Sequence, residues 1–396
     1  MNLLFKLAAK NLIGAGLRTW LNVIVLSFSF LIIIWHKGLL DGWDRQAKNE
    51  TIKWETGGGQ YWQSSYDPYD PFSLTEAHAK IPSTLDSLVS AGNVAPVLIT
   101  QGTIYPRGRI QSILIKGINS NQKLLKIPSS LFIKNSEEIP ALIGRNTASD
   151  NGIKEGDLVT LRWRDVHGTF DANSIKIIGI FDTDVPSVDM GQIWVPLDHL
   201  QKMMGMPGEA TIIVTDKEQQ GTVNSEEWKF KNNEFLLKAI TDLIKMKSVG
   251  GFVLYIILLS LAMLAIFDTQ ILSIFRRQKE IGTYIALGMT RGQVVGLFTI
   301  EGSLNSVLAG LLAALYGIPL LAIQASHGMS IPGGSKGFGL AVADRLYPVY
   351  SLGLVITTIL LILLTTTIVS YLPSRKIARM KPTDALRGKI QLSDFY

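Results

Sequence analysis

Four long runs of apolar residues stand out along a sequence of 396 residues. They cover residues 20–40, 249–275, 294–323 and 349–372. A helix needs about 20 mostly apolar residues to cross a bilayer, so each run is long enough. The exit of the first run has no small-x-small cleavage site, and we interpret it as an uncleaved anchor. The pattern predicts an α-helical membrane protein with four transmembrane helices.

Between the first and second runs, residues 41–248 show short apolar stretches in place of long ones. Strands are predicted by the patterns at residues 94–100, 112–116, 158–163, 174–180 and 210–215. Short helices are predicted at residues 141–151 and 197–204. The first transmembrane helix is expected to continue to about Trp54, and the glycines at 57–59 then break it. Residues 41–248 therefore form a large α+β domain with mixed sheets.

Charge orients these segments. Lysine and arginine gather in the N-terminal tail, in residues 276–293 and in residues 373–396, whereas the loop before the fourth run has few. Because positive residues accumulate on the cytoplasmic side, both termini are expected in the cytoplasm and residues 41–248 outside it. The predicted segments of the chain, in order, are 1–40 (tail and first helix), 41–248 (extracytoplasmic domain), 249–275 (second helix), 276–293 (cytoplasmic loop), 294–323 (third helix), 324–348 (periplasmic loop), 349–372 (fourth helix) and 373–396 (cytoplasmic tail).

Composition agrees with a partly embedded chain, since 47% of residues are hydrophobic and only 18% are charged. The net charge of +6 is spread beside the apolar runs, which does not favour a nucleic-acid binder. There are no cysteines, so disulfides and thiolate metal sites are excluded. A large outer domain must then be stabilised by its core.

Catalytic chemistry is not evident. The five histidines are scattered, which argues against zinc. Asp182, Asp184 and Asp189 are better explained as turn and cap carboxylates than as a calcium loop. The stretch 333–336 lacks the spacing of a phosphate-binding loop. We therefore predict no catalytic residue, metal or cofactor in this chain, which is not an enzyme by itself.

The third apolar run carries small residues at four-residue steps: Gly302, Ser306, Gly310 and Ala314. Such a stripe lets helix backbones approach closely, within the chain or against a partner copy. Glu301 in the same run could reach interface water or Arg291. For Glu301, as for Asp268 in the second run, a structural role and a transport role are both open.

Residues 276–293 form a distinctive loop. Ile281, Tyr284, Ile285 and Gly288 fall on one face of a helix. The loop is too short to fold alone, so this amphipathic helix is expected to rest on lipid headgroups or on a partner protein.

The same loop resembles the pattern E-R-x-x-E-I-G-x-x-x-A-L-G-A-T-x-x-Q-I of permeases of the FtsX/MacB/Lol superfamily of ABC transporters. Residues 373–387 are similar to the family's ending, and residues 9–19 to its entry helix. The resemblance implies a MacB-type periplasmic core domain between the first two helices. It also implies that the loop is a coupling helix that docks on an ATPase subunit. The implied coupling residues are Arg277, Glu280, Ile281, Gly282, Tyr284, Ile285, Leu287, Gly288, Thr290 and Arg291.

Within that superfamily, residues 142–160 and 179–184 are most similar to the lipoprotein-releasing LolC/LolE branch, although Val185 and Pro186 depart from it. This resemblance implies the permease subunit of a transporter in the bacterial inner membrane that extracts lipoproteins. Its partners would be a cytoplasmic ATPase dimer that binds ATP and Mg²⁺, a second permease subunit, lipoprotein cargo and a periplasmic carrier. Two alternatives stay open, namely MacB-like export of small amphiphiles or peptides and an FtsX-like relay of ATPase motion to cell-wall hydrolases.

Lipid cargo sets a physical requirement. Moving an acyl chain out of the bilayer costs about 0.8 kcal/mol for each CH₂ group, so three long chains would cost more than about 30 kcal/mol in water. An apolar cavity between helices would offset this cost. In relatives it lies between the first two helices of two permease copies. The residues expected to line it are Val25, Phe28, Phe30, Ile33, Trp35, Phe252, Tyr255, Ile256 and Leu259.

Overall fold

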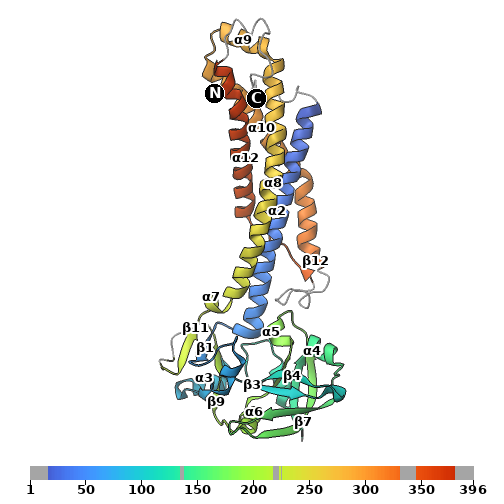
Figure 1. Cartoon of the computed structure of the whole chain (residues 1–396), viewed down its shortest axis with the longest axis vertical. Helices are drawn as coiled ribbons and strands as arrows, with labels where there is room; N and C mark the ends of the chain where they lie inside the picture. Colours follow the sequence, from blue (N-terminus) through green and yellow to red (C-terminus); the bar gives the residue numbers. More distant parts are fainter. Residues whose placement is uncertain (1–16, 134–137, 217–222, 224, 331–344, 380–396) are drawn as a thin grey trace. The chain divides into compact units, whose positions relative to one another are not determined.

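A computed structural model describes residues 17–133, 138–216, 223, 225–330 and 345–379 (Figure 1). The chain divides into two compact units. The helical unit comprises Met1–Trp43, Ile244–Met329 and Tyr347–Tyr396. The sheet unit comprises Asp44–Leu243 and Ser330–Leu346. The chain passes from one unit to the other within the first long helix and within the second.

Four described helices are long and apolar enough to cross a membrane. They contain the first three predicted spans and the fourth from Leu352 onward, because residues 349–351 precede the helix. They are α2 (Leu17–Thr51), α8 (Lys238–Arg276), α10 (Arg291–His327) and α12 (Leu352–Arg375). A short helix, α9 (Gln278–Ala286), joins α8 to α10, and the 3₁₀ segment η7 (Lys376–Arg379) follows α12.

All four long helices of the helical unit contribute to a shared apolar core. Buried residues there are Val23, Leu26, Phe30, Ile33, Leu259, Ala262, Ile266, Ala309 and Ile362. Polar pairs supplement this packing. Asn22 of α2 donates to the hydroxyl of Thr269 of α8 at 2.7 Å, and the hydroxyls of Ser303 of α10 and Thr367 of α12 lie 3.0 Å apart. Such hydrogen bonds between helices contribute about 0.6 kcal/mol each on average in a membrane.

The sheet unit is built on nine strands of the described chain that pair in the order β11-β1-β10-β3-β4-β8-β5-β7-β6. Their bounds are β1 Gly59–Gln63, β3 Val94–Ile104, β4 Gln111–Ile118, β5 Ile139–Gly144, β6 Leu158–Arg164, β7 Phe170–Phe181, β8 Gln192–Pro196, β10 Ile212–Thr215 and β11 Trp228–Lys231. Short strands β2 (Ala79–Lys80) and β9 (Glu209–Ala210) pair separately, and β12 (Met329–Ser330) and β13 (Arg345–Leu346) lie later in the chain.

Strand β3 also pairs with β6, so six strands from β3 to β6 close into a ring of pairings. Inward residues of this ring alternate with outward ones, as the pleat requires. Leu98, Ile115 and Ile193 lie in the buried core, while their neighbours Ile99, Lys116 and Trp194 lie on the other face. Strands β10, β1 and β11 extend the sheet beyond β3. Parallel pairs (β4 with β8, β5 with β7) occur among antiparallel ones, which confirms a mixed sheet.

Short helical segments connect the strands. The α-helices are α3 (Asp86–Ala91), α4 (Arg145–Asn151), α5 (Pro186–Asp189), α6 (Leu197–Met204) and α7 (Asn233–Leu236). The 3₁₀ segments are η2 (Pro71–Thr75), η3 (Ser83–Leu85), η4 (Pro106–Gly108) and η5 (Ser129–Ile133), and η1 (Ile52–Thr56) is a π-helical turn that directly follows α2. Gly57 then ends the helical run with a φ of 56°, as the glycine pattern predicts.

Four of the five predicted strands lie within β3, β4, β6 and β7, and the predicted helix at 197–204 coincides with α6. The strand predicted at 210–215 is divided, because Ala210 ends β9 and β10 begins at Ile212. The helix predicted at 141–151 is half wrong, because residues 141–144 belong to β5 and only Arg145–Asn151 is helical. Every residue of β5 is buried, since β7 and β8 flank it and both of its faces are covered. A strand that is buried on both faces shows no alternation of apolar and polar residues. Its sequence pattern cannot then be distinguished from that of a buried helix.

Candidate functional site

The connection between α8 and α10 is the candidate site, and it lies at one end of the helical unit (Figure 1). Ile281 of α9 is fully buried. Its surroundings are residues from α8, α10 and η7: Ile271, Ile274, Val294, Val295, Phe298 and Ile377. Tyr284, Ile285 and Met289 pack around the same cluster. The apolar face of α9 therefore packs on its own chain, which corrects the expectation that it rests on lipid or on a partner.

An ion-pair network holds the start of α9 against α10. Arg277 donates to both carboxylate oxygens of Glu301, at 2.9 and 3.2 Å, and to Glu280 at 2.7 Å. Its guanidinium also lies 4.9 Å from the ring centroid of Phe298. Burial opposes the charge of Arg277, but hydrogen bonds and attraction from Glu280 and Glu301 raise its pKa above the usual value. Glu301, for which the sequence suggests water or Arg291, thus joins two helices through Arg277.

The ends of α9 and α10 are fixed by residues of the family pattern. Gly288 has a φ of 99°, a conformation that favours glycine, and this residue terminates α9. Thr290 then caps α10. Its hydroxyl accepts from the amide of Gln293 at 3.3 Å, and the Gln293 side chain accepts from the amide of Thr290 at 2.8 Å. This reciprocal pair is a capping box, so Thr290 and Gln293 start a helix.

The residues left exposed on α9 and at Leu287, the residue that caps its C-terminal end, lie on the face opposite Ile281. We name them the tip surface: Lys279, Glu280, Thr283, Ala286 and Leu287. Their spacing of three, four and seven residues places them on one side of the helix. Leu287 is 79% exposed and is the large apolar side chain of this surface. The other exposed coupling residues of the prediction are Gly288, Thr290 and Arg291. Ile281 and Gly282 are buried, and the half-buried ones are Arg277, Tyr284 and Ile285.

The predicted packing stripe on α10 lies mostly inside the bundle. Gly302 is buried where α12 and α8 approach, and a side chain there would collide with Ser370 and Gln270. Ser306 is also buried, and Gly310 lies next to Phe30 of α2. Ala314 at the end of the stripe is exposed. The small residues therefore serve close packing within the chain.

The predicted cargo residues do not form one surface. Phe30, Ile33 and Leu259 are in the core of the helical unit, with Tyr255 packed against it. Val25, Phe28, Phe252 and Ile256 are instead exposed, and Trp35 is half-buried. The expectation that all of them line one cavity is thus wrong for Phe30, Ile33 and Leu259, because the bundle needs these side chains for its own core.

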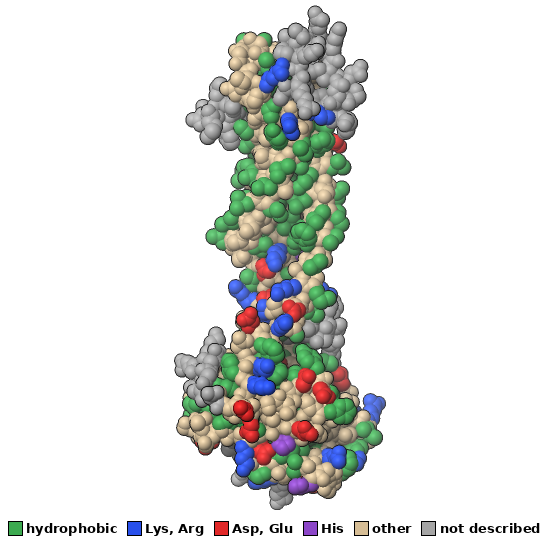
Figure 2. Space-filling view, turned by 60° about the vertical axis from the view of Figure 1, so that its left-hand side comes forward, with side chains coloured by type: hydrophobic (Ala, Val, Ile, Leu, Met, Phe, Trp, Pro, Cys, Tyr) green, Lys and Arg blue, Asp and Glu red, His purple; other side chains and the backbone are tan. Residues whose placement is uncertain are grey.

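An apolar groove of about 510 Å³ does include two of the exposed cargo residues, Val25 and Phe28. It lies among α2, α8 and α10, and the hydroxyls of Ser27 and Tyr316 meet there at 3.2 Å. Exposed apolar residues continue along α2 at helical spacing: Leu21, Ile24, Val25 and Phe28. Figure 2 shows hydrophobic side chains gathered over the surface of the helical unit, as expected for helices in lipid.

The acidic cluster of the sheet unit is structural. Asp189 is buried and accepts from the backbone amides of Asn146 and Thr147, so it caps the start of α4. Burial raises the pKa of Asp189 although these donors favour the charged form. Asp182 pairs with Arg145 at 2.8 Å. Asp268 of α8 is exposed. The stretch 333–336, residues 9–16 and residues 380–387 lie outside the described part of the chain.

Comparison with known proteins adds independent information. Residues 252–382 match the family described as FtsX-like permease C-terminal, a segment that contains α9, α10 and α12 with most of α8. The chain is 25% identical over 281 residues to an uncharacterised ABC transporter permease of Methanocaldococcus jannaschii, and the match spans 66% of each chain.

Among solved structures, the extracellular domain of the noncanonic ABC-type transporter YknZ from Gram-positive bacteria is similar at 13% identity. The match covers 44% of this chain and 98% of that domain, with a TM-score of 0.27.

Proposed function

We propose that this chain, which carries an FtsX-like permease domain, is the membrane subunit of an ABC-type transporter and is driven by a separate ATPase. The tip surface is the observation that carries the proposal. The buried face of α9 attaches it to α8 and α10, while its opposite face offers an exposed leucine among polar residues. A helix held in this way presents a firm surface to a partner and moves only together with the helices it packs on.

In this proposal the ATPase binds ATP and Mg²⁺, and closure of its subunits displaces α9. The pair between Arg277 and Glu301 and the packing of Ile281 transfer the displacement to α10 and α8. Both termini and α9 would face the cytoplasm, and the sheet unit would lie on the other side. This orientation rests on the distribution of lysine and arginine.

The test of docking uses Leu287→Asp in the full-length chain. Burying a leucine stabilises an interface by about 1.5–3 kcal/mol, so its loss should weaken ATPase binding roughly ten- to hundredfold. The measurement is the amount of ATP-hydrolysing subunit that co-purifies, with its identity established by mass spectrometry. Phe72→Asp is a matched control, because Phe72 is 85% exposed but belongs to the sheet unit. Equal loss in both variants, or no loss in either, would contradict docking at the tip surface.

For the cargo, we propose the lipidated proteins that the resemblance to the LolC/LolE branch implies. The exposed apolar stripe of α2 and the groove beside it support an acyl-chain site, because an apolar surface lowers the cost of moving acyl chains. A second permease subunit would complete the cavity, and a periplasmic carrier would receive the cargo.

A photo-crosslinking side chain at position 28 tests the cargo during ATP turnover. Crosslinks to acylated proteins are expected at position 28 but not at position 30, because Phe30 is buried. Crosslinks only to unacylated peptides or small amphiphiles would favour MacB-like export. If no cargo is captured while the sheet unit retains a cell-wall hydrolase, the FtsX-like relay is the better explanation.

A further inference from the structure

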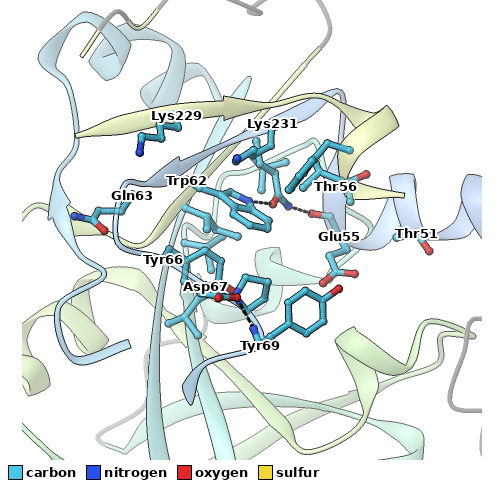
Figure 3. Close-up of a pocket in the computed structure, with 18 of the residues that line it drawn as sticks. Thr51, Glu55, Thr56, Trp62, Gln63, Tyr66, Asp67, Tyr69, Lys229 and Lys231 are labelled. Carbon is cyan, nitrogen blue, oxygen red and sulfur yellow. Dashed lines mark hydrogen bonds between the residues drawn. The ribbon is translucent and has the colours of Figure 1, made fainter. Parts of the chain in front are cut away.

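The sheet unit contains a pocket of about 700 Å³ (Figure 3). Six consecutive strands, from β11 to β8, form its floor. Their side chains share one face because the pairing register aligns them. Lys229 lies opposite Trp62, Trp62 opposite Ile212, and Ile212 opposite Val97. In the next strands, Ile99 lies opposite Lys116 and Lys116 opposite Trp194. The volume is typical of sites for small molecules, which range over about 300–1,000 Å³.

Lys116 is the unusual residue of this floor. It is only 8% exposed, and the residues opposite it on both neighbouring strands are apolar or aromatic. Within the described chain, its ammonium has a single hydrogen bond, to the carbonyl of Ser187 at 3.4 Å, and lies 5.1 Å from the ring centroid of Trp194. Glu55 attracts it but forms no ion pair within 4 Å in the described residues, and burial lowers the pKa of Lys116. A buried ammonium with so few acceptors favours an additional anion.

The remaining lining points to the rest of the ligand. Val97, Ile99, Ile212 and Val214 give the floor an apolar character. The aromatic rings of Phe235 and Trp62 at one side of the pocket already contact a cation of the protein. The ammonium of Lys231 lies 4.4 Å from the ring centroid of Phe235 and 5.8 Å from that of Trp62. Figure 3 shows Lys229 and Lys231 on the strand beside the one that carries Trp62. A cationic ligand would meet these lysines, and an anionic one would be attracted.

We propose that this pocket binds a small anionic molecule with an apolar body, and that Lys116 holds its charged group. Walls of the pocket come from η1, through Glu55 and Thr56, and from the start of α8, through Lys238 and Asp242. A ligand would therefore contact the segments through which the sheet unit continues into α2 and α8. The proposal goes beyond the ATPase-driven function and does not depend on it.

Binding is tested with octanoate and octyl phosphate on the full-length chain in lipid nanodiscs, with octanol as the uncharged analogue and empty nanodiscs as the blank. Saturation-transfer NMR and calorimetric titration give the affinities. Wild-type protein should bind at least one of the two anions more tightly than octanol, and the tighter of the two identifies a carboxylate or a phosphate group. This comparison needs no variant.

Lys116→Met keeps the length of the side chain and removes the charge. It should weaken anion binding about tenfold or more, because hydrogen bonds to charged groups are strong, and leave octanol binding unchanged. Lys116→Arg should retain anion binding. Lys229→Met is the matched control at an exposed lysine of the same pocket and should change the affinity at most about fivefold. The proposal is wrong if neither anion binds, if octanol binds as tightly, or if the Met variant binds the anions undiminished.

Discussion

Replacing Ile281 by alanine should loosen α9 without removing any residue of its exposed face. Ile281 has no exposed surface, and its side chain packs among residues of α8, α10 and η7. Truncation of a fully buried isoleucine to alanine costs about 2–5 kcal/mol, which combines lost burial with the cavity that is left. Ile281→Val removes only one methyl group and should cost about 0.5–1.5 kcal/mol.

Amide hydrogen exchange measures this effect locally. The opening equilibrium of α9 should rise roughly thirtyfold to several thousandfold in Ile281→Ala, and by a smaller factor in Ile281→Val. Leu287→Ala provides the contrast. The side chain of Leu287 is 79% exposed, so the free energy of opening of α9 in this variant should stay within about 0.5 kcal/mol of the wild-type value. ATPase binding should nevertheless weaken. Amides of β4 in the sheet unit serve as the internal reference.

The reasoning would be refuted if Ile281→Ala and Leu287→Ala changed the exchange of α9 equally, or if their order were reversed. Either result would mean that the apolar face of α9 does not pack on its own chain. The same pair of variants separates two readings of a loss of ATPase binding. Ile281→Ala loses binding because α9 loosens, whereas Leu287→Ala loses it with α9 intact.

Two further predictions concern packing and charge. Gly302→Ala should lower the free energy of unfolding by about 1–3 kcal/mol, because the added methyl group meets Ser370 and Gln270. Gly296→Ala has open space around it and should raise the free energy of unfolding by up to about 1 kcal/mol. Thermal unfolding of both variants in nanodiscs measures the difference. The pKa of Lys116 is lower in the folded chain than in the unfolded chain, where it is about 10.5. Between these two pKa values the unfolded chain binds more protons. The free energy of unfolding should therefore rise with pH across that window. Lys116→Met should remove this rise and stabilise the protein near neutral pH. A wild-type free energy of unfolding that does not change with pH across the window would contradict the prediction.

The sequence alone determined those helices and strands whose formation depends on residues close to each other along the chain. Apolar runs predicted the long helices because spanning length and composition are local properties. The alternation of strands such as β6, with exposed and buried residues in turn, was equally readable. The short helix of the coupling loop was predicted from its spacing, and α6 from its pattern.

Tertiary structure decided which residues share a surface. Ile281 and Leu287 belong to the same short pattern, yet one is buried against α8 and α10 and the other is exposed. Phe28 and Phe30 lie two residues apart on α2 and point to different surroundings, so a list of apolar residues could not separate cavity from core.

Long-range pairing explains the other differences. Residues 141–144 form a strand because β7 and β8 pair with the two edges of β5. Both partner strands come later in the sequence, beyond the reach of a local pattern. Lys116 is an ordinary strand lysine in the sequence, and only the order of six strands places it beside Ile99 and Trp194 in a pocket. Burial depends on partners that a local pattern does not contain, and the chemistry of a buried charge follows from that burial.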